Sequence, residues 1–260
     1  MNRVAFSIFG LNIYYYSLFI LLGVIIGYIL ITREAKKLGY DKKVISDFIF
    51  YTLLIGIVGV RLYYVVFNLD YYLSNPVDIL KIYNGGLAIH GGVIFGLVFA
   101  FFYCKKKELN FLRILDICAP AVILAQGIGR WGNFFNGEAH GGITTLEKLK
   151  ELFVPDFVIE GMKIDGVYYY PTFYFESILC IIGFIIIMLL RRYKNIKVGC
   201  QIGFYFIWYG IVRFFIESFR TDSLMLFNLK MAQIVSIIGI IIGIVLIILS
   251  RNKEKYYKEV

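Results

Sequence analysis

The sequence predicts an all-α integral membrane protein with seven transmembrane helices. Only 17% of its 260 residues are charged and its mean hydropathy is +0.75, whereas soluble globular chains have about 25% charged residues. The uncharged residues are concentrated in blocks that reach the length of a membrane helix, about 20 apolar residues. This composition argues against a soluble enzyme, a nucleic-acid-binding module and a disordered chain.

Seven apolar segments follow one another along the chain. The predicted spans cover residues 14–32, 46–67, 87–104, 114–135, 172–190, 200–219 and 231–250. The first span follows a segment that carries only Arg3 and lacks a small-residue cleavage site, so we expect a retained helix and not a removed signal peptide. We expect the seven helices to form a single membrane domain over residues 1–260.

Basic residues predict how the helices are oriented. One set of alternate connections, with the C-terminal tail, holds 17 Lys and Arg, and the other set holds 7. Cytoplasmic loops carry the excess of Lys and Arg, so we expect the N-terminus outside and the C-terminus in the cytoplasm. The loops account for most of the net charge of +9, which is therefore no sign of a nucleic-acid partner.

The longest polar connection predicts a small extracytoplasmic head at residues 137–170. Helical spacing of apolar residues predicts a helix over Thr145–Phe153, ended by Pro155. Residues 157–160 and 167–170 are predicted to form the two strands of a hairpin around a turn between Gly161 and Gly166.

Three arginines, Arg61, Arg130 and Arg213, lie within the predicted spans or at their edges. A charge near the bilayer centre costs at least about 2.5–3.5 kcal/mol, so an intramembrane arginine indicates a functional site with a partner. A structural ion pair, or a side chain that reaches the membrane surface, is the alternative for each.

The fourth span ends in a stretch, Gly127–Gly142, in which six of sixteen residues are glycine. Glycine weakens a regular helix, and irregular backbone at membrane depth occurs only where it is buried in protein or lines a cavity. The guanidinium of Arg130 suits a phosphate. Helix packing through glycine explains the glycines alone, and it leaves the polar side chains unexplained. These are Asn133, Asn136 and Glu138.

The sixth span carries Tyr209, Arg213, Glu217 and Arg220 on one face. At about 100° per residue their positions fall within an arc of about 80°, and Arg213 and Glu217 can pair as i and i+4 neighbours. A salt bridge that lets the helix insert is the alternative to a charged, wet cavity.

His90 lies near the outer end of the third span, beside two glycines, and Tyr16 begins the first span at the same level. Histidine suits proton transfer near neutral pH, although a lone membrane histidine can also be a packing element. Arginines and a histidine at headgroup level predict an anionic phospholipid handled at the outer leaflet.

Three blocks of the sequence together resemble the prolipoprotein diacylglyceryl transferase family over essentially the whole chain. The blocks are Gly129–Gly141, His90-Gly91-Gly92, and Tyr209–Arg213 followed by Glu217 and Arg220. The resemblance implies an enzyme of the bacterial cytoplasmic (inner) membrane with its active site toward the outer leaflet. Its reaction transfers the diacylglyceryl group of phosphatidylglycerol to the lipobox cysteine in the signal peptide of a prolipoprotein and releases glycerol-1-phosphate. No metal or organic cofactor is implied.

The resemblance also implies residue roles. Catalysis would involve His90, Arg130 and Arg213. Substrate binding would involve Arg130, Tyr16, Asn133, Asn136, Glu138, Gly141, Tyr209, Glu217, Arg61 and Arg220. The chain departs from the family pattern at Tyr170, where His is frequent, and at Asn84, where Asp is frequent, which leaves those two local roles undefined.

In the mechanism we hypothesise, Arg130 and Arg213 stabilise the departing phosphate and the attacking sulfur is a thiolate. His90 is the base, or it holds the water or tyrosine that is. Two other classes of function use the same residues: an anionic-lipid or anion transporter, and a membrane scaffold in which the polar groups serve helix packing.

Overall fold

The computed structural model describes residues 3–8, 11–81, 85–221, 225–226 and 229–256. The chain divides into two compact units, unit 1 with residues 1–31 and 115–260, and unit 2 with residues 32–114. Within the described residues, seven helices are long and apolar enough to cross a membrane, which confirms the predicted spans. They are α1 (Tyr15–Lys37), α2 (Lys42–Val66), α4 (Ile89–Lys106), α5 (Phe111–Asn136), α8 (Thr172–Arg191), α9 (Cys200–Phe219) and α10 (Met231–Ser250).

Several helices extend past the predicted spans into charged turns. α1 continues to Lys37, where Gly39, with a φ of 78°, turns the chain. α2 already begins at Lys42, because the side chain of Asp41 accepts a hydrogen bond of 2.6 Å from the backbone N–H of Lys43. Capping residues therefore determine where these helices end, and the apolar pattern alone does not predict those ends.

Unit 2 is built on the packing of α2 against α4. The two helices approach closely at Gly59 and Gly91, where a Cβ on either glycine would collide with the other helix. The connection between them contains α3 (Leu69–Ser74) and the short 3-10 helix η1 (Pro76–Leu80). The close approach fixes the first turn of α4 against α2.

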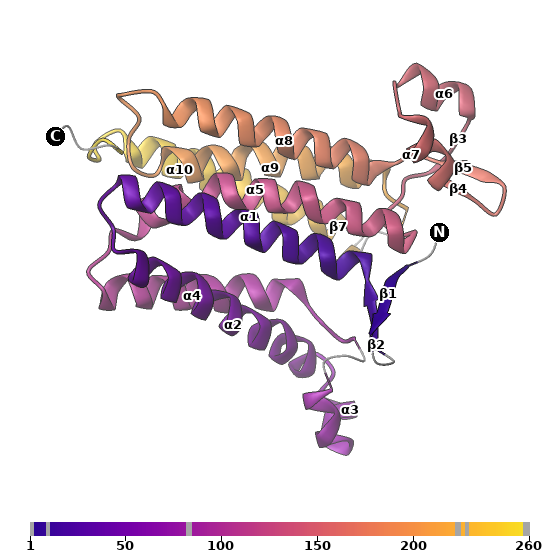
Figure 1. The fold of residues 1–260 in the computed structure, drawn as a ribbon, viewed down its shortest axis with the longest axis horizontal. Coiled ribbons are helices and arrows are strands. Elements are labelled where there is room, and N and C mark those ends of the chain that lie inside the picture. The colour runs from indigo at the N-terminus through magenta and orange to yellow at the C-terminus, as the bar shows by residue number, and fades with distance from the viewer. Residues whose placement is uncertain (1–2, 9–10, 82–84, 222–224, 227–228, 257–260) are drawn as a thin grey trace. The chain divides into compact units, whose positions relative to one another are not determined.

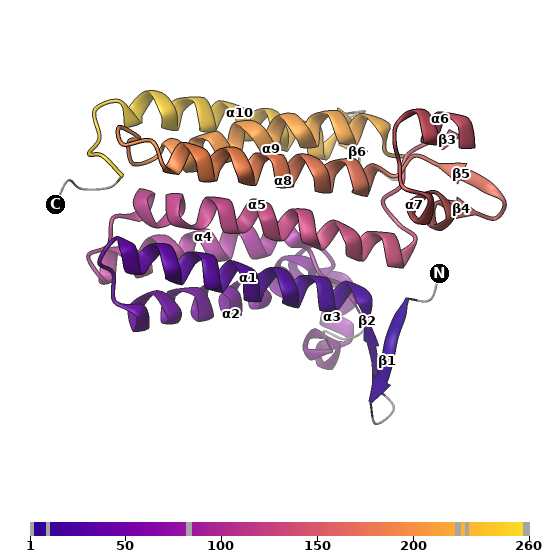
Figure 2. The same ribbon diagram turned by 45° about the horizontal axis from the view of Figure 1, so that its top comes forward.

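Unit 1 contains α5, α8, α9 and α10, which run alongside one another (Figures 1 and 2). α9 packs against both α8 and α10, and the indole Nε1 of Trp131 on α5 donates to the hydroxyl of Ser177 on α8 at 3.1 Å. The C-terminal part of α5 therefore faces the N-terminal part of α8.

The predicted head at residues 137–170 folds between α5 and α8. It contains β3 (Ile143–Thr144), α6 (Leu146–Glu151), α7 (Asp156–Gly161), β4 (Lys163–Ile164) and β5 (Val167–Tyr169), with an antiparallel sheet in the order β3-β5-β4. Its apolar core includes Phe134 of α5 and Phe173 of α8. Contacts with both neighbouring helices therefore hold the head in place within unit 1.

One prediction for the head is confirmed and one is wrong. The predicted helix forms as α6, and Thr145 caps it. The first predicted strand of the hairpin is wrong, because residues 157–160 belong to α7 and the first strand is β4 instead. The strands meet instead at a tight turn in which Asp165 and Gly166 have φ values of 49° and 84°, as an Asp-Gly hairpin turn requires.

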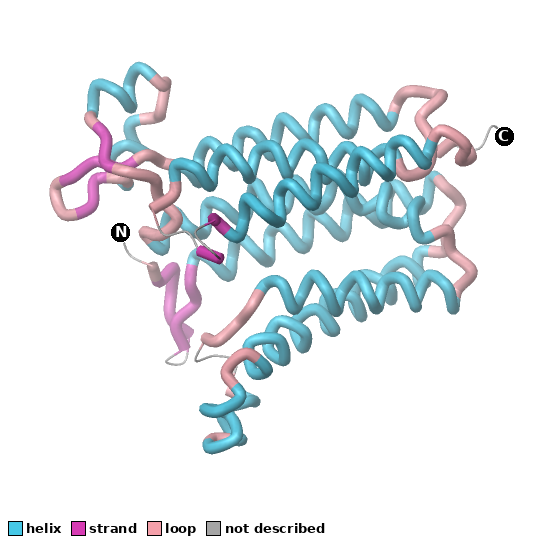
Figure 3. Tube along the Cα trace, turned by 180° about the vertical axis from the view of Figure 1, so that it is seen from behind, coloured by secondary structure: helices cyan, strands magenta, loops and turns pink. Residues whose placement is uncertain are grey.

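Two further hairpins were not predicted. β1 (Val4–Ile8) pairs with β2 (Leu11–Tyr14), which leads directly into α1. β6 (Met225–Leu226) pairs with β7 (Leu229–Lys230), which leads into α10. Figure 3 shows the strands of unit 1 gathered at the end where α1 begins and α5 ends.

Candidate active site

The glycine-rich stretch remains helical as far as Asn136, so the expectation of irregular backbone holds only from Gly137, where φ is 67°. A glycine in this stretch instead permits close packing: a Cβ on Gly132 would lie 2.5 Å from Cδ2 of Tyr16 on α1. Tyr16 is therefore packed against α5 at Gly132, two residues after Arg130.

The guanidinium of Arg130 has close partners at Nη2, a longer contact at Nη1 and none at Nε among the described residues. Its Nη2 lies 2.9 Å from Oε1 of Glu176 and donates to the hydroxyl of Tyr209 at 3.1 Å. Its Nη1 reaches Oδ1 of Asn133 only at 3.5 Å. Its Nε is buried and has no hydrogen-bond partner among the described residues. A buried donor without a partner is costly, so this group is suited to an anionic ligand.

Glu176 joins the two arginines of unit 1. Its side chain, on the second turn of α8, is 2% exposed, and its Oε2 lies 3.2 Å from Nη1 of Arg213 on α9. The hydroxyl of Tyr209 donates to its Oε1 at 3.2 Å. One buried carboxylate therefore holds the guanidinium groups of Arg130 and Arg213 near each other.

The polar stripe predicted on α9 is confirmed as a row of alternating charges. Nη2 of Arg213 lies 2.6 Å from Oε2 of Glu217, and Nε of Arg220 lies 3.9 Å from the same oxygen. With Arg130 and Glu176 the row contains three cations and two anions. Its formal charge is positive, so it can accept a singly charged anion without a buried excess charge.

A second polar group lies just beyond the end of α5. Oε1 of Glu138 accepts hydrogen bonds from Nδ2 of Asn133 at 3.1 Å and from Nδ2 of Asn136 at 3.0 Å. Gly141 follows, bridged to Arg220 at the end of α9. A Cβ there would lie 3.1 Å from the carbonyl oxygen of Phe219, so glycine permits this contact. Asn133 connects this group to Arg130.

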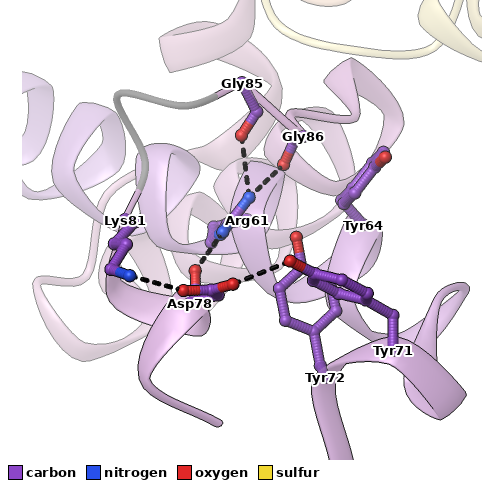
Figure 4. A pocket seen from close by; sticks show the side chains of 8 residues that line it. All are labelled: Arg61, Tyr64, Tyr71, Tyr72, Asp78, Lys81, Gly85 and Gly86. Carbon is purple, nitrogen blue, oxygen red and sulfur yellow. Dashed lines mark hydrogen bonds and ion pairs between the residues drawn. The ribbon is translucent and has the colours of Figure 1, made fainter. Parts of the chain in front are cut away.

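His90 and Arg61 lie in unit 2. His90 is exposed on the first turn of α4, with its ring 6.4 Å from the ring of Tyr63. Arg61 is 6% exposed, and its guanidinium donates to four backbone carbonyls. These are the carbonyls of Ile79 and, as Figure 4 shows, of Asp78, Gly85 and Gly86. The structure thus brings together the predicted site residues of unit 1 in one group, and it places these two residues in the other unit.

The Arg61 side chain borders a cavity of about 140 Å³ that is lined by polar and aromatic groups. Asp78 accepts hydrogen bonds of 2.7 Å from both Lys81 and Tyr71. These two bonds lower the pKa of the Asp78 carboxyl from its ordinary value, and the bond to Asp78 raises the pKa of Tyr71. Asp78 is therefore ionised at neutral pH.

Within the described residues, no group of three or more His, Cys, Asp or Glu is placed to hold a metal ion. The side chains that converge in unit 1 are instead donors and carboxylates arranged around two arginines. A family model for prolipoprotein diacylglyceryl transferases matches residues 3–249. The chain belongs to this family. It is therefore a multi-pass membrane protein and a transferase.

Curated relatives in this family cover nearly all of the chain. A protein of Staphylococcus haemolyticus is 48% identical over 262 residues, which are 100% of this chain and 92% of the relative. A Staphylococcus aureus (strain Newman) protein is 48% identical over 254 residues, 97% of this chain and 90% of the relative. A Staphylococcus xylosus protein is 45% identical over 263 residues, 100% of this chain and 94% of the relative. Each is named phosphatidylglycerol–prolipoprotein diacylglyceryl transferase.

One of the two departures from the family pattern can be located. The carbonyl of Tyr170 accepts a hydrogen bond of 2.8 Å from the backbone N–H of Gly141, and its own N–H donates to Gly142 at 3.0 Å. Its backbone thus holds the glycine pair that ends the stretch Gly127–Gly142. Asn84 lies outside the described residues.

Sequence reasoning missed Glu176. Its signal was present, because it is a carboxylate inside an otherwise apolar span. A carboxylate at membrane depth indicates a cationic partner, although the sequence does not show that Arg130 and Arg213 share this one.

Proposed function

We propose that this protein transfers the diacylglyceryl group of phosphatidylglycerol to the lipobox cysteine thiol of prolipoproteins and releases glycerol-1-phosphate, the first step of bacterial lipoprotein maturation. The names of the relatives support the two substrates. The single structural observation that carries the proposal is the buried arginine pair on Glu176, together with the buried Nε of Arg130, which has no hydrogen-bond partner among the described residues. A phosphodiester with one negative charge suits a row with one excess positive charge.

The proposed reaction exchanges one bond at a glycerol carbon. A carbon–sulfur bond forms, the bond from that carbon to a phosphate oxygen breaks, and its electrons leave with glycerol-1-phosphate. Charge builds on the phosphate, where Arg130 and Arg213 stabilise it; in comparable sites the loss of one such donor costs about 10²–10³ in rate. The thiol proton passes to a base, for which His90 is the candidate, directly or through a water or a tyrosine.

The polar residues around Arg130 have separate tasks in this proposal. Glu176 holds the two guanidinium groups at a fixed spacing, which keeps them ready for the phosphate without reorganisation. Asn133, Asn136 and Glu138 offer hydrogen bonds to the glycerol hydroxyls at the outer end of α5. Tyr16 and Gly141 line the approach on either side, and Arg220 and Glu217 extend the charged row.

The site is proposed to face the outer leaflet of the bacterial cytoplasmic membrane. The 17-to-7 distribution of Lys and Arg supports an N-terminus outside and a C-terminus in the cytoplasm. In that orientation the end of α5, the start of α8 and residues 137–170 lie on the extracytoplasmic side. All seven helices then serve one functional domain over residues 1–260.

The deciding experiment incubates the purified protein with phosphatidylglycerol and a lipobox peptide. We expect the peptide cysteine to gain the mass of a diacylglyceryl group, with an equal amount of glycerol-1-phosphate released. A peptide with Ser in place of the cysteine is the control and should stay unmodified. A transporter would release no glycerol-1-phosphate, and absence of both products would refute the proposal.

A further inference from the structure

Arg61 differs from Arg130, whose Nε has no partner among the described residues, because each guanidinium nitrogen of Arg61 donates to a backbone carbonyl. Its Nε donates to the carbonyl of Ile79 at 2.9 Å, and its Nη1 donates to the carbonyls of Gly85 and Gly86, each at 2.8 Å. Its Nη2 donates to the carbonyl of Asp78. The planar face of the guanidinium lies 5.1 Å from the ring centre of Tyr72. All three nitrogens are therefore bonded to the backbone of the connection between α2 and α4.

These bonds connect α2 to the segment that enters α4. The backbone N–H of Ala88 donates to the carbonyl of Val60, the residue before Arg61, at 3.1 Å. α4 begins at the next residue, and His90 is its second residue. On the far side of His90, Gly91 packs against Gly59 without room for a Cβ. His90 is thus fixed between two anchors, both made to α2 within three residues of one another.

Gly86 shows how closely the guanidinium is fitted. Its φ is 71°, and a Cβ at this position would lie 2.6 Å from Nη1 of Arg61. Gly85 has a similar φ of 87°, yet a Cβ there would meet nothing within 4 Å. The two glycines share a backbone conformation that favours glycine, and only one of them also makes room for Arg61.

We propose that Arg61 is a positioning residue that sets the orientation of His90 by binding this connection to α2, and not a ligand of the substrate. The catalytic importance of this positioning rests on the proposed function, in which His90 acts as a base. The positioning itself rests on unit 2 alone. In this proposal Arg61 does not contact the phosphate. It acts indirectly, by holding the first turn of α4, where His90 lies.

The first test measures His90 without any substrate. The protein contains two histidines, so a His140→Gln background leaves His90 as the histidine that diethyl pyrocarbonate modifies. Arg61→Gln and Gly86→Ala should each change the modification rate of His90 several-fold, because both release or displace the guanidinium. Gly85→Ala is the matched control and should keep the rate within a factor of about 2. Equal effects of Gly85→Ala and Gly86→Ala would overturn the proposal.

The second test is a double-mutant cycle on thioether formation. Arg61→Gln should lower turnover by about 100-fold in the parent protein, as a misplaced group does, but by a factor of about 2 or less in a His90→Gln background. Equal losses in both backgrounds would overturn the positioning role. If no variant and no parent forms thioether, the proposed function fails, while the change in His90 modification still supports the positioning.

Discussion

Glu176 on α8 and Arg213 on α9 form an ion pair of 3.2 Å although 37 residues separate them in the chain. The same carboxylate binds Arg130 through its other oxygen. Two guanidinium groups that would repel each other are therefore held together by one anion. Glu176 is thus the carboxylate that Arg130 and Arg213 share, while Arg213 also pairs with Glu217; this sharing leads to the first prediction.

Glu176→Gln should lower both folded yield and turnover. The amide keeps the shape of the side chain but leaves two arginines without their shared anion, and an unpaired buried charge costs about 3–5 kcal/mol. Thermal unfolding in detergent and thioether formation measure the two effects. The matched control is Glu151→Gln, which removes an exposed ion pair with Lys148 and should change stability by about 0–1 kcal/mol. Unchanged unfolding in the Glu176 variant would contradict the prediction.

Arg130→Lys should lose most turnover while the protein remains folded. An ammonium keeps the positive charge beside Glu176, but it lacks the planar set of donors that binds a phosphate at two points. The rate of glycerol-1-phosphate release at saturating phosphatidylglycerol measures the loss. Arg192→Lys, at an exposed arginine after α8, is the control. Nearly full turnover in Arg130→Lys would mean that Arg130 acts only as a point charge.

Arg213→Gln and the double variant Arg213→Gln with Glu217→Gln should both be nearly inactive. The single change leaves Glu217 without its 2.6 Å partner, whereas removal of both charges of a buried pair can be neutral. The double variant should therefore recover folded yield in detergent but form no product. Recovery of activity in the double variant would show that Arg213 is a structural partner of Glu217 and does not act on the phosphate.

A cysteine at Lys163 should react with a membrane-impermeant maleimide added to intact cells, and a cysteine at Lys106 should not. Both positions are exposed, so a difference in labelling reports the side of the membrane and not burial. Lys163 lies in the head and Lys106 ends α4, on the side that the basic residues assign to the cytoplasm. Permeabilised cells, in which both positions should react, provide the control. The reverse pattern would invert the topology and remove the argument for the outer leaflet.

The connection between α2 and α4 in unit 2 should loosen in acid. Hydrogen bonds from Lys81 and Tyr71 lower the pKa of Asp78 from its ordinary value of 3.8. The ionised Asp78 carboxylate therefore stabilises the connection fully above that ordinary value. This stabilisation is lost as the pH falls through the lowered pKa, so the loosening is expected below about pH 4. Hydrogen exchange of residues 76–81, corrected for intrinsic rates, measures it. Asp78→Asn should show the weaker protection at every pH, and a pH-dependent change in that variant would contradict the assignment.

The sequence predicted the membrane fold well because hydrophobic length is a local property. α8, α9 and α10 end within a residue of the predicted spans. The ends of α1 and α2 were missed by several residues because capping by Gly39 and Asp41 extends helices into charged turns. The β1–β2 hairpin was missed because its strands are mostly apolar and lead directly into the adjoining span, so hydropathy does not separate the two.

The site was predicted in part. The face shared by Tyr209, Arg213 and Glu217 follows from helix geometry alone and is confirmed. The partner of Arg130 could not be identified from spacing, because Arg130 lies on α5 and Glu176 on α8, and residue spacing predicts neighbours only within one helix. The role of Arg61 was also inaccessible, because its partners are backbone carbonyls and a sequence does not show which carbonyls lack hydrogen bonds.

The shared carboxylate has a consequence for how the protein is made. Synthesis proceeds from the N-terminus, so Arg130 of α5 is made before Glu176, which follows 46 residues later in the chain. At about 5–20 residues per second this interval lasts on the order of 2–9 s. Asn133, on the same helix, is the contact of Arg130 that is made within that interval. The ion pair of Arg130 can therefore form only once α8 has been made.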